Sequence, residues 1–169
     1  GERRLYHLTG AKTHTDPKRV LLYANVNTNV IDGSSVWLIN TARMLSSRYK
    51  VDLLLRAKIS TRYLLSELES NPGIRIIPPD AFPLHMQCFG DTHFLEDYSA
   101  AELITRLDLE HNYRFVLCRG KLVNYYLALN PRVNHKLVSY FLMDYYKFDH
   151  ESLESEVTIL RNVINNASV

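Results

Sequence analysis

Short runs of apolar residues recur along the chain at the spacing of strands in a parallel sheet. Strands that are buried on both faces are apolar throughout, whereas half-exposed strands alternate between apolar and polar residues. Five runs fit the buried pattern, at 20–24 (VLLYA), 51–55 (VDLLL), 74–77 (IRII), 114–118 (RFVLC) and 137–143 (LVSYFLM). The first of these is the best candidate for the central strand.

Helical periodicity appears between the apolar runs. After Val36, apolar residues recur at intervals of three and four, which predicts an amphipathic helix with one buried face. Similar patterns predict helices within 61–69, 100–107, 122–129 and 153–164, and Ser99 with Glu102 has the spacing of a capping box. Alternating strands and helices predict an α/β fold, a doubly wound and mostly parallel sheet with helices on both faces.

The predicted domain occupies residues 19–169, after a basic and loosely ordered leader at 1–18. One connection, 78–98, is longer than the ~12 to 15 residues of most structureless loops, and its aromatic residues favour a folded excursion. His85, Cys88 and His93 in this excursion lack the paired spacing of zinc ligands, so we predict no metal site.

The turn after the first strand is the first candidate binding site. Gly33, Ser34 and Ser35 precede the predicted helix, and either serine could serve as its N-cap. The first amides of a helix lack internal partners and carry the positive end of its dipole, so this turn could receive a phosphate. The alternative is that Gly33 only fits the turn and the serines only cap the helix. Neither a dinucleotide fingerprint nor a P-loop motif is present.

Polar residues follow the other predicted strands as well. Ligands of open parallel sheets bind beyond the carboxyl ends of the strands, where the strand order reverses. The residues expected at this rim are Asn27, Arg119, Gly120, Lys121 and Asp144. Their amides and charges suit a ligand with phosphate or many hydroxyls, although each alone could be a solvated loop residue. No catalytic residue can be assigned, since the G-x-S-x-G nucleophile motif is absent.

Composition narrows the class of protein. A chain of 169 residues fits one domain, and its formal net charge of +2 is too small to predict nucleic-acid binding. Cys88 and Cys118 are far apart in sequence, which favours a reducing, cytoplasmic environment over a disulfide framework. The basic residues of the leader could touch an acidic lipid surface, or they could form a solvated tail.

Residues 20–55 resemble the first βαβ unit in the N-terminal, acceptor-side domain of GT-B glycosyltransferases. The family has a strand, a glycine-containing loop, a helix and a short turn to a V-x-L-L strand. The alternation of predicted strands and helices in the rest of this chain agrees with the family to about Val169. The resemblance implies half of a GT-B fold, without a cofactor, and transfer of a sugar from a nucleotide-sugar donor to a saccharide or lipid-linked acceptor. Such activity is typical of polysaccharide biosynthesis.

The resemblance also implies residue roles. Gly33 and Ser34, with Ser35 beside them, match the loop that approaches the donor diphosphate. Arg119, Gly120 and Lys121, and also Asp144 and Tyr145, match rim loops that face the acceptor or the transferred sugar. Many relatives have one more glycine beside Gly33, and Met143 stands where a histidine is frequent.

The family's donor-binding half would lie beyond Val169, so we expect residues 1–169 alone to lack transferase activity. Two other classes remain open. One is a stand-alone Rossmann-like module that binds a phosphorylated small molecule, and the other is an interaction domain whose long aromatic loop docks a partner chain.

Overall fold

In the part of the chain that the structure describes, five strands form one parallel sheet, in agreement with the predicted α/β fold. The computed structural model describes residues 16–79 and 95–140. The strands are β1 (Arg19–Ala24), β2 (Lys50–Leu54), β3 (Ile74–Ile77), β4 (Val116–Arg119) and β5 (Leu137–Tyr140). Their order is β3-β2-β1-β4-β5, and every pairing between neighbours is parallel. Each begins or ends within two residues of its predicted apolar run, except that the fifth run continues past Tyr140, outside the described residues.

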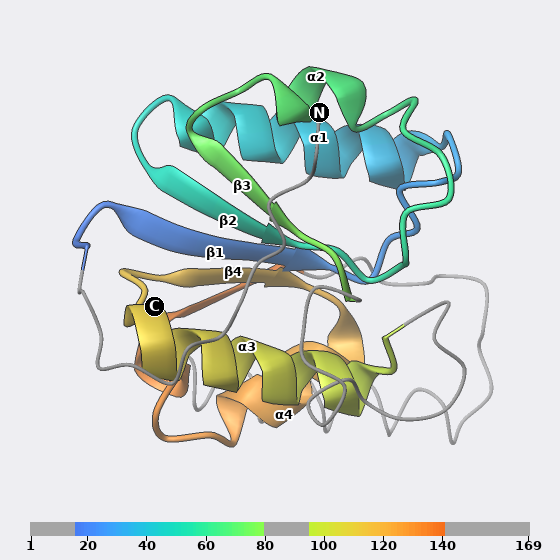
Figure 1. Cartoon of the computed structure of the whole chain (residues 1–169). Helices are drawn as coiled ribbons and strands as arrows, with labels where there is room; N and C mark the ends of the chain where they lie inside the picture. The colour runs from blue at the N-terminus through green and yellow to red at the C-terminus, as the bar shows by residue number, and fades with distance from the viewer. Residues whose placement is uncertain (1–15, 80–94, 141–169) are drawn as a thin grey trace, which may run out of the picture.

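Helices cover both faces of this sheet, which gives a Rossmann-like arrangement of three layers. The helices are α1 (Gly33–Ser46), α2 (Ser66–Glu69), α3 (Asp97–His111) and α4 (Lys121–Ala128), and a short 3-10 helix at Asn134–Lys136 precedes β5. In Figure 1, α1 and α2 lie on one side of the strands, and α3 and α4 lie on the other.

The two layers of helices produce two hydrophobic cores. Leu21 and Tyr23 of β1 belong to the core beneath α3 and α4, whereas Val20 and Leu22 belong to the core beneath α1 and α2. All four side chains have no solvent exposure. Because successive residues of a strand point to opposite faces, burial on both faces explains the unbroken apolar run that identified this strand.

The strand order reverses between β1 and β4. From β1 the chain proceeds through β2 to β3 at one edge, and it then crosses through α3 to β4 on the other side of β1. The carboxyl ends of β1 and β4 therefore flank the topological switch point, where ligands of such sheets bind. The first turns of α1 and α4 lie beside it.

The N-terminal boundaries of α1 and α3 differ from those predicted from the sequence. The N-cap of α1 is Asp32 and neither serine: the Asp32 carboxylate accepts from the Ser35 amide at 2.8 Å, and the Ser35 hydroxyl accepts from the Asp32 amide at 3.0 Å. The predicted capping box at Ser99 is also wrong. Helix α3 begins earlier, at Asp97, and Ser99 is buried inside its first turn.

The second predicted helix is shorter than expected. Only Ser66–Glu69 is α-helical, and the side chain of Asn29 binds the segment that precedes this helix. Its carbonyl oxygen accepts from the amides of Ser60 and Thr61, both at 3.0 Å, and its amide donates to the Lys58 carbonyl at 2.8 Å. These bonds connect residues 58–61 to the turn that follows β1.

Three predicted features lie outside the described residues. They are the leader except for residues 16–18, most of the excursion at 78–98, and the last helix at 153–164. Tyr98, assigned to the excursion, lies in the first turn of α3. Among the described helices, none has the length and apolar character needed to cross a bilayer.

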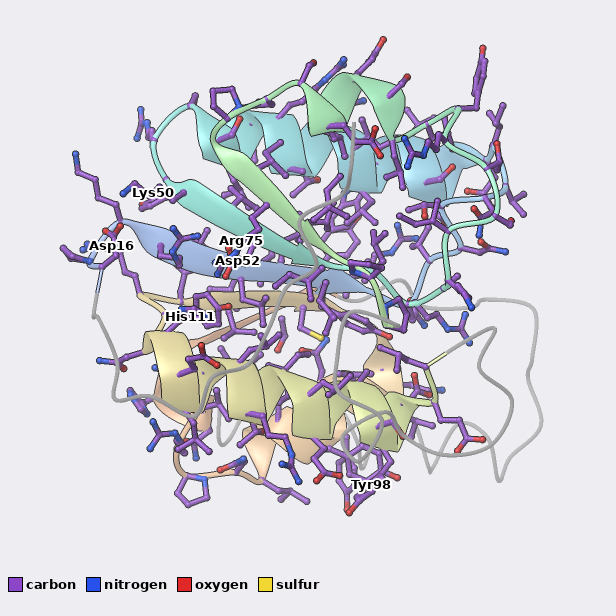
Figure 2. The ribbon with its side chains drawn as sticks, in the orientation of Figure 1. Asp16, Lys50, Asp52, Arg75, Tyr98 and His111 are labelled. Carbon is purple, nitrogen blue, oxygen red and sulfur yellow. The ribbon has the colours of Figure 1, made fainter. Side chains whose placement is uncertain are left out.

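A buried ionic cluster lies between the sheet and the end of α3, and it contains a histidine. Asp52 of β2 is bound by Arg75 of β3, and the Arg75 Nη2 atom is 3.2 Å from the His111 Nε2 atom. Figure 2 shows Asp52 and Arg75 together, with His111 beyond them toward α3. Burial, followed by the Arg75 cation, lowers the pKa of His111 below its usual value.

This lowered pKa predicts a pH-dependent stability. The unfolded chain protonates His111 at a higher pH than the folded chain, so the contribution of this residue is full above about pH 6.5 and declines as the pH falls toward its folded-state pKa. We expect His111→Gln to show a smaller loss of stability between about pH 7 and pH 5 than the unchanged protein. Urea denaturation at several pH values measures this difference, and equal slopes for both proteins would contradict the assignment.

Candidate functional site

The candidate site lies where the carboxyl ends of β1 and β4 meet the first turns of two helices. The Asn25 amide, just after β1, donates to the carbonyl oxygen of Arg119 at 3.0 Å. Gly120 directly follows Arg119 and is the N-cap residue of α4. The residues predicted after β1 and after β4 therefore share one edge of the sheet.

Arg119 is the central side chain of this site. It was predicted to lie in a loop, but it is the last residue of β4, paired with Ala24 of β1 and Tyr140 of β5. Its side chain is on the face covered by α1, and the residue is only 6% exposed. Its Nη2 atom donates to the Ser34 hydroxyl at 2.9 Å, which joins two predicted site residues that are 85 positions apart.

Two aromatic rings flank the guanidinium of Arg119. Its Cζ atom is 4.8 Å from the ring centroid of Trp37 in α1 and 5.8 Å from that of Tyr140. The two rings are themselves 4.8 Å apart, tilted by 31°. Such cation–π contacts stabilise a cation by about 0.5 to 2 kcal/mol each.

The positive charge of Arg119 is not neutralised by an ion pair among the described residues. Within the described part of the chain, no carboxylate lies within ion-pair distance of it. Burial lowers the pKa of Arg119, while Tyr140 and the carboxylate of Asp32 act in the opposite direction. Arginine remains protonated under these conditions, so the site holds a buried positive charge.

The start of α1 supplies further hydrogen-bond donors. The helical bonds begin with the Val36 amide, which donates to the Asp32 carbonyl, and the Asp32 carboxylate occupies the Ser35 amide. The amides of Gly33 and Ser34 precede that point and are the donors that a helix start offers to an anion. A Cβ atom built on Gly33 would meet nothing within 4 Å, and its φ is not in the left-handed region. The fold therefore does not require a glycine here.

The other rim residues are arranged differently. Gly120 has φ 145° and ψ 123°, a conformation that favours glycine, and its Cα faces the side chain of Asn25. Lys121 begins α4. Asn27 is used locally, because its side-chain oxygen accepts from the Asn29 amide at 3.0 Å. Asp144 and Tyr145 lie outside the described residues.

Three residues of the site were missed in the sequence. Asp32 was assigned to the turn but not as the cap, although an aspartate three residues before a serine has capping-box spacing. Trp37 and Tyr140 were assigned only to a helix and a strand. No local signal identifies them, because their contact with Arg119 depends on the pairing of β4 with β5.

Two other reactive side chains of the described residues, Cys118 and Tyr23, are inaccessible to solvent. Cys118 is a free thiol without solvent exposure, and burial raises its pKa far above the usual range. Burial raises the pKa of Tyr23 in the same way. Among the described residues, no cluster of three His, Cys, Asp or Glu side chains could hold a metal ion.

An open groove of about 540 Å³ lies between α3 and α4, away from Arg119. Tyr98 and Tyr126 stand in edge-to-face contact along it, with centroids 5.9 Å apart. Figure 2 shows Tyr98 on the outer side of α3. The groove lacks a buried charge, so the switch point is the better-built site.

Comparison of this chain with known protein families, curated proteins and solved structures found no match. The likeness to GT-B glycosyltransferases therefore rests on the residues quoted above.

Proposed function

We propose that this domain contacts the diphosphate of a nucleotide sugar at the carboxyl edge of β1 and β4, as the acceptor-side domain of a glycosyltransferase whose donor-binding half supplies the other contacts to the donor. The observation that carries the proposal is Gly33. This residue has neither a left-handed backbone nor a crowded Cα, so its missing side chain has no structural purpose. What the missing side chain does provide is open access to the first amides of α1.

The neighbouring charges support the same ligand. Arg119 adds a cation beside the positive end of α1, and Ser34 joins the two. Asp32 already neutralises part of the helix dipole, so the dipole alone would attract an anion weakly. The buried guanidinium compensates for that loss and makes a diphosphate a suitable occupant.

Replacement of Gly33 by valine tests the proposal. Since a Cβ at this position meets no atom, we expect Gly33→Val to fold normally and to bind UDP-glucose at least about tenfold more weakly, because each charge-assisted hydrogen bond contributes about 1.5 to 3 kcal/mol. Calorimetric titration measures this affinity, with other nucleotide sugars tested in parallel.

The matched control is Asn40→Val, which places the same β-branched side chain on an exposed position of the same helix. This variant is expected to bind the nucleotide sugar as the unchanged protein does. Equal affinities of Gly33→Val and the unchanged protein would refute a role of the helix start. Absence of binding by the unchanged protein to any nucleotide sugar tested would refute the proposed function.

A second function fits one specific observation. Arg119 is a single buried cation, which suits one phosphate group as well as a diphosphate. A Rossmann-like module that binds a phosphorylated small molecule would use the same crevice. Tighter binding of a sugar phosphate than of any nucleotide sugar would favour this second function.

A further inference from the structure

The contacts of the buried Arg119 guanidinium offset only part of the free energy that its desolvation costs. Moving a charge out of water is costly even after the protein relaxes. The two aromatic contacts offset only part of this cost, and the Ser34 hydroxyl accepts only one of the five guanidinium N–H bonds. Buried arginines are ordinarily paired with a carboxylate, which the described residues do not supply here.

The surroundings of Arg119 restrict its position. The rings of Trp37 and Tyr140 come from α1 and β5, and β4 itself is hydrogen-bonded on both sides. A planar fork that is held in this way loses little conformational freedom when it binds an oxyanion through two parallel N–H bonds. A lysine could bring the same charge without this directional fork.

We propose that Arg119 recognises one phosphoryl group through its guanidinium fork, with Trp37 and Tyr140 as positioning residues. This inference rests on the proposed function only in that the crevice holds a phosphate-bearing ligand. It adds which side chain contacts a phosphoryl group and that the contact is bidentate. The inference also includes β5 in the site through Tyr140, whereas phosphate binding by the amides of α1 alone would not involve β5.

The arrangement provides its own reporter. Trp37 is the only tryptophan of the chain, and its ring lies directly against the Arg119 guanidinium. An anion that binds Arg119 alters the charge beside the indole, so the emission of Trp37 should change and saturate as the site fills. Inorganic pyrophosphate and UDP serve as the probes at constant ionic strength, and calorimetry gives the affinity independently of the fluorescence.

The variants separate charge from geometry. Arg119→Met should abolish pyrophosphate binding, and Arg119→Lys should weaken it at least about tenfold, since the bidentate contact is lost while the charge stays. Tyr140→Leu should weaken binding less than either. The matched control is Arg114→Met, which removes the same charge at an exposed residue just before β4, at the opposite end of that strand.

The outcomes are distinct. Unchanged pyrophosphate affinity in a folded Arg119→Met protein would overturn the inference, and so would equal affinity in Arg119→Lys if the methionine variant fails to fold. Absence of pyrophosphate binding to the unchanged protein would overturn it too. If pyrophosphate binds through Arg119 but no nucleotide sugar binds, the inference stands and the proposed function fails. If a nucleotide sugar binds equally well without Arg119, the reverse holds.

Discussion

Replacing Asp52 by alanine is expected to lower the free energy of unfolding by about 3 to 5 kcal/mol, the cost of removing one partner from a buried ionic cluster. The side chain of Asp52 has no solvent exposure. Its carboxylate accepts from Arg19 Nη1 at 2.7 Å, from Arg75 Nε at 2.9 Å and from the Tyr113 hydroxyl at 2.6 Å. Without it, the partly buried guanidiniums of Arg19 and Arg75 lose the carboxylate that they share.

Denaturation by urea, followed by circular dichroism, measures this loss. The matched control is Asp16→Ala, which breaks an ion pair of 2.8 Å with Lys50 and a hydrogen bond of 2.9 Å from the Lys18 amide, both at the exposed end of the sheet (Figure 2). Exposed pairs of this kind contribute little, so the control should unfold at an unchanged urea concentration. A fall in stability as small as that of the control would show that the cluster is dispensable.

Asp52 also illustrates what the sequence could and could not predict. The run VDLLL was correctly predicted as a buried strand, because four of its five residues are apolar. The aspartate inside it had no explanation at that stage. Its partners Arg19, Arg75 and Tyr113 are 33, 23 and 61 residues away in sequence, so only the folded sheet brings them together.

The predictions of the residues that cap α1 and α3 were wrong for a related reason. Local spacing allowed either Ser34 or Ser35 to cap α1, but the Ser34 hydroxyl accepts from Arg119, and Asp32 serves as the cap. For α3, a serine that could have capped the helix is buried within it instead. The side chain of a possible capping residue can form either a local hydrogen bond or a tertiary one. Sequence spacing describes only the local bonds.

The candidate site was partly predictable because the order of strands and helices alone indicates which strand ends lie at the same edge of the sheet. Parallel strands bring their carboxyl ends to one edge, so residues after β1 and at the end of β4 were expected to meet there, and Ser34 and Arg119 do. The aromatic rings beside Arg119 could not be predicted in this way. They depend on the register that pairs Arg119 with Tyr140 and on the side of α1 that bears Trp37.

The last prediction concerns Gly120, between Arg119 and the first residue of α4. We expect Gly120→Ala to destabilise the protein by about 1 to 3 kcal/mol, since its φ of 145° is in a region that is almost restricted to glycine. An added Cβ would also lie 3.3 Å from Cγ and 3.4 Å from Cβ of Asn25, closer than most real contacts. The strain falls on the backbone that carries Arg119, so pyrophosphate binding should weaken as well.

Gly33→Ala is the matched control, because the same methyl group enters open space there and the φ of Gly33 lies outside the left-handed region. Alanine at such a position reduces the entropy of the unfolded chain, so this variant should be as stable as the unchanged protein or about 0.4 to 1 kcal/mol more stable. The opposite signs of the two glycine substitutions, measured by urea denaturation, distinguish a constrained glycine from a free one.

Combining Gly120→Ala with Asn25→Ala separates the two causes of strain. The truncated Asn25 side chain no longer has the Cγ and Nδ2 atoms near the new methyl group, so any stability that returns belongs to the steric contact. The part that does not return belongs to the backbone conformation and to the remaining contact with the Asn25 Cβ atom. Because the conformation is expected to dominate, most of the loss should persist in the double variant. A Gly120→Ala protein as stable as Gly33→Ala would contradict the constraint at the switch point.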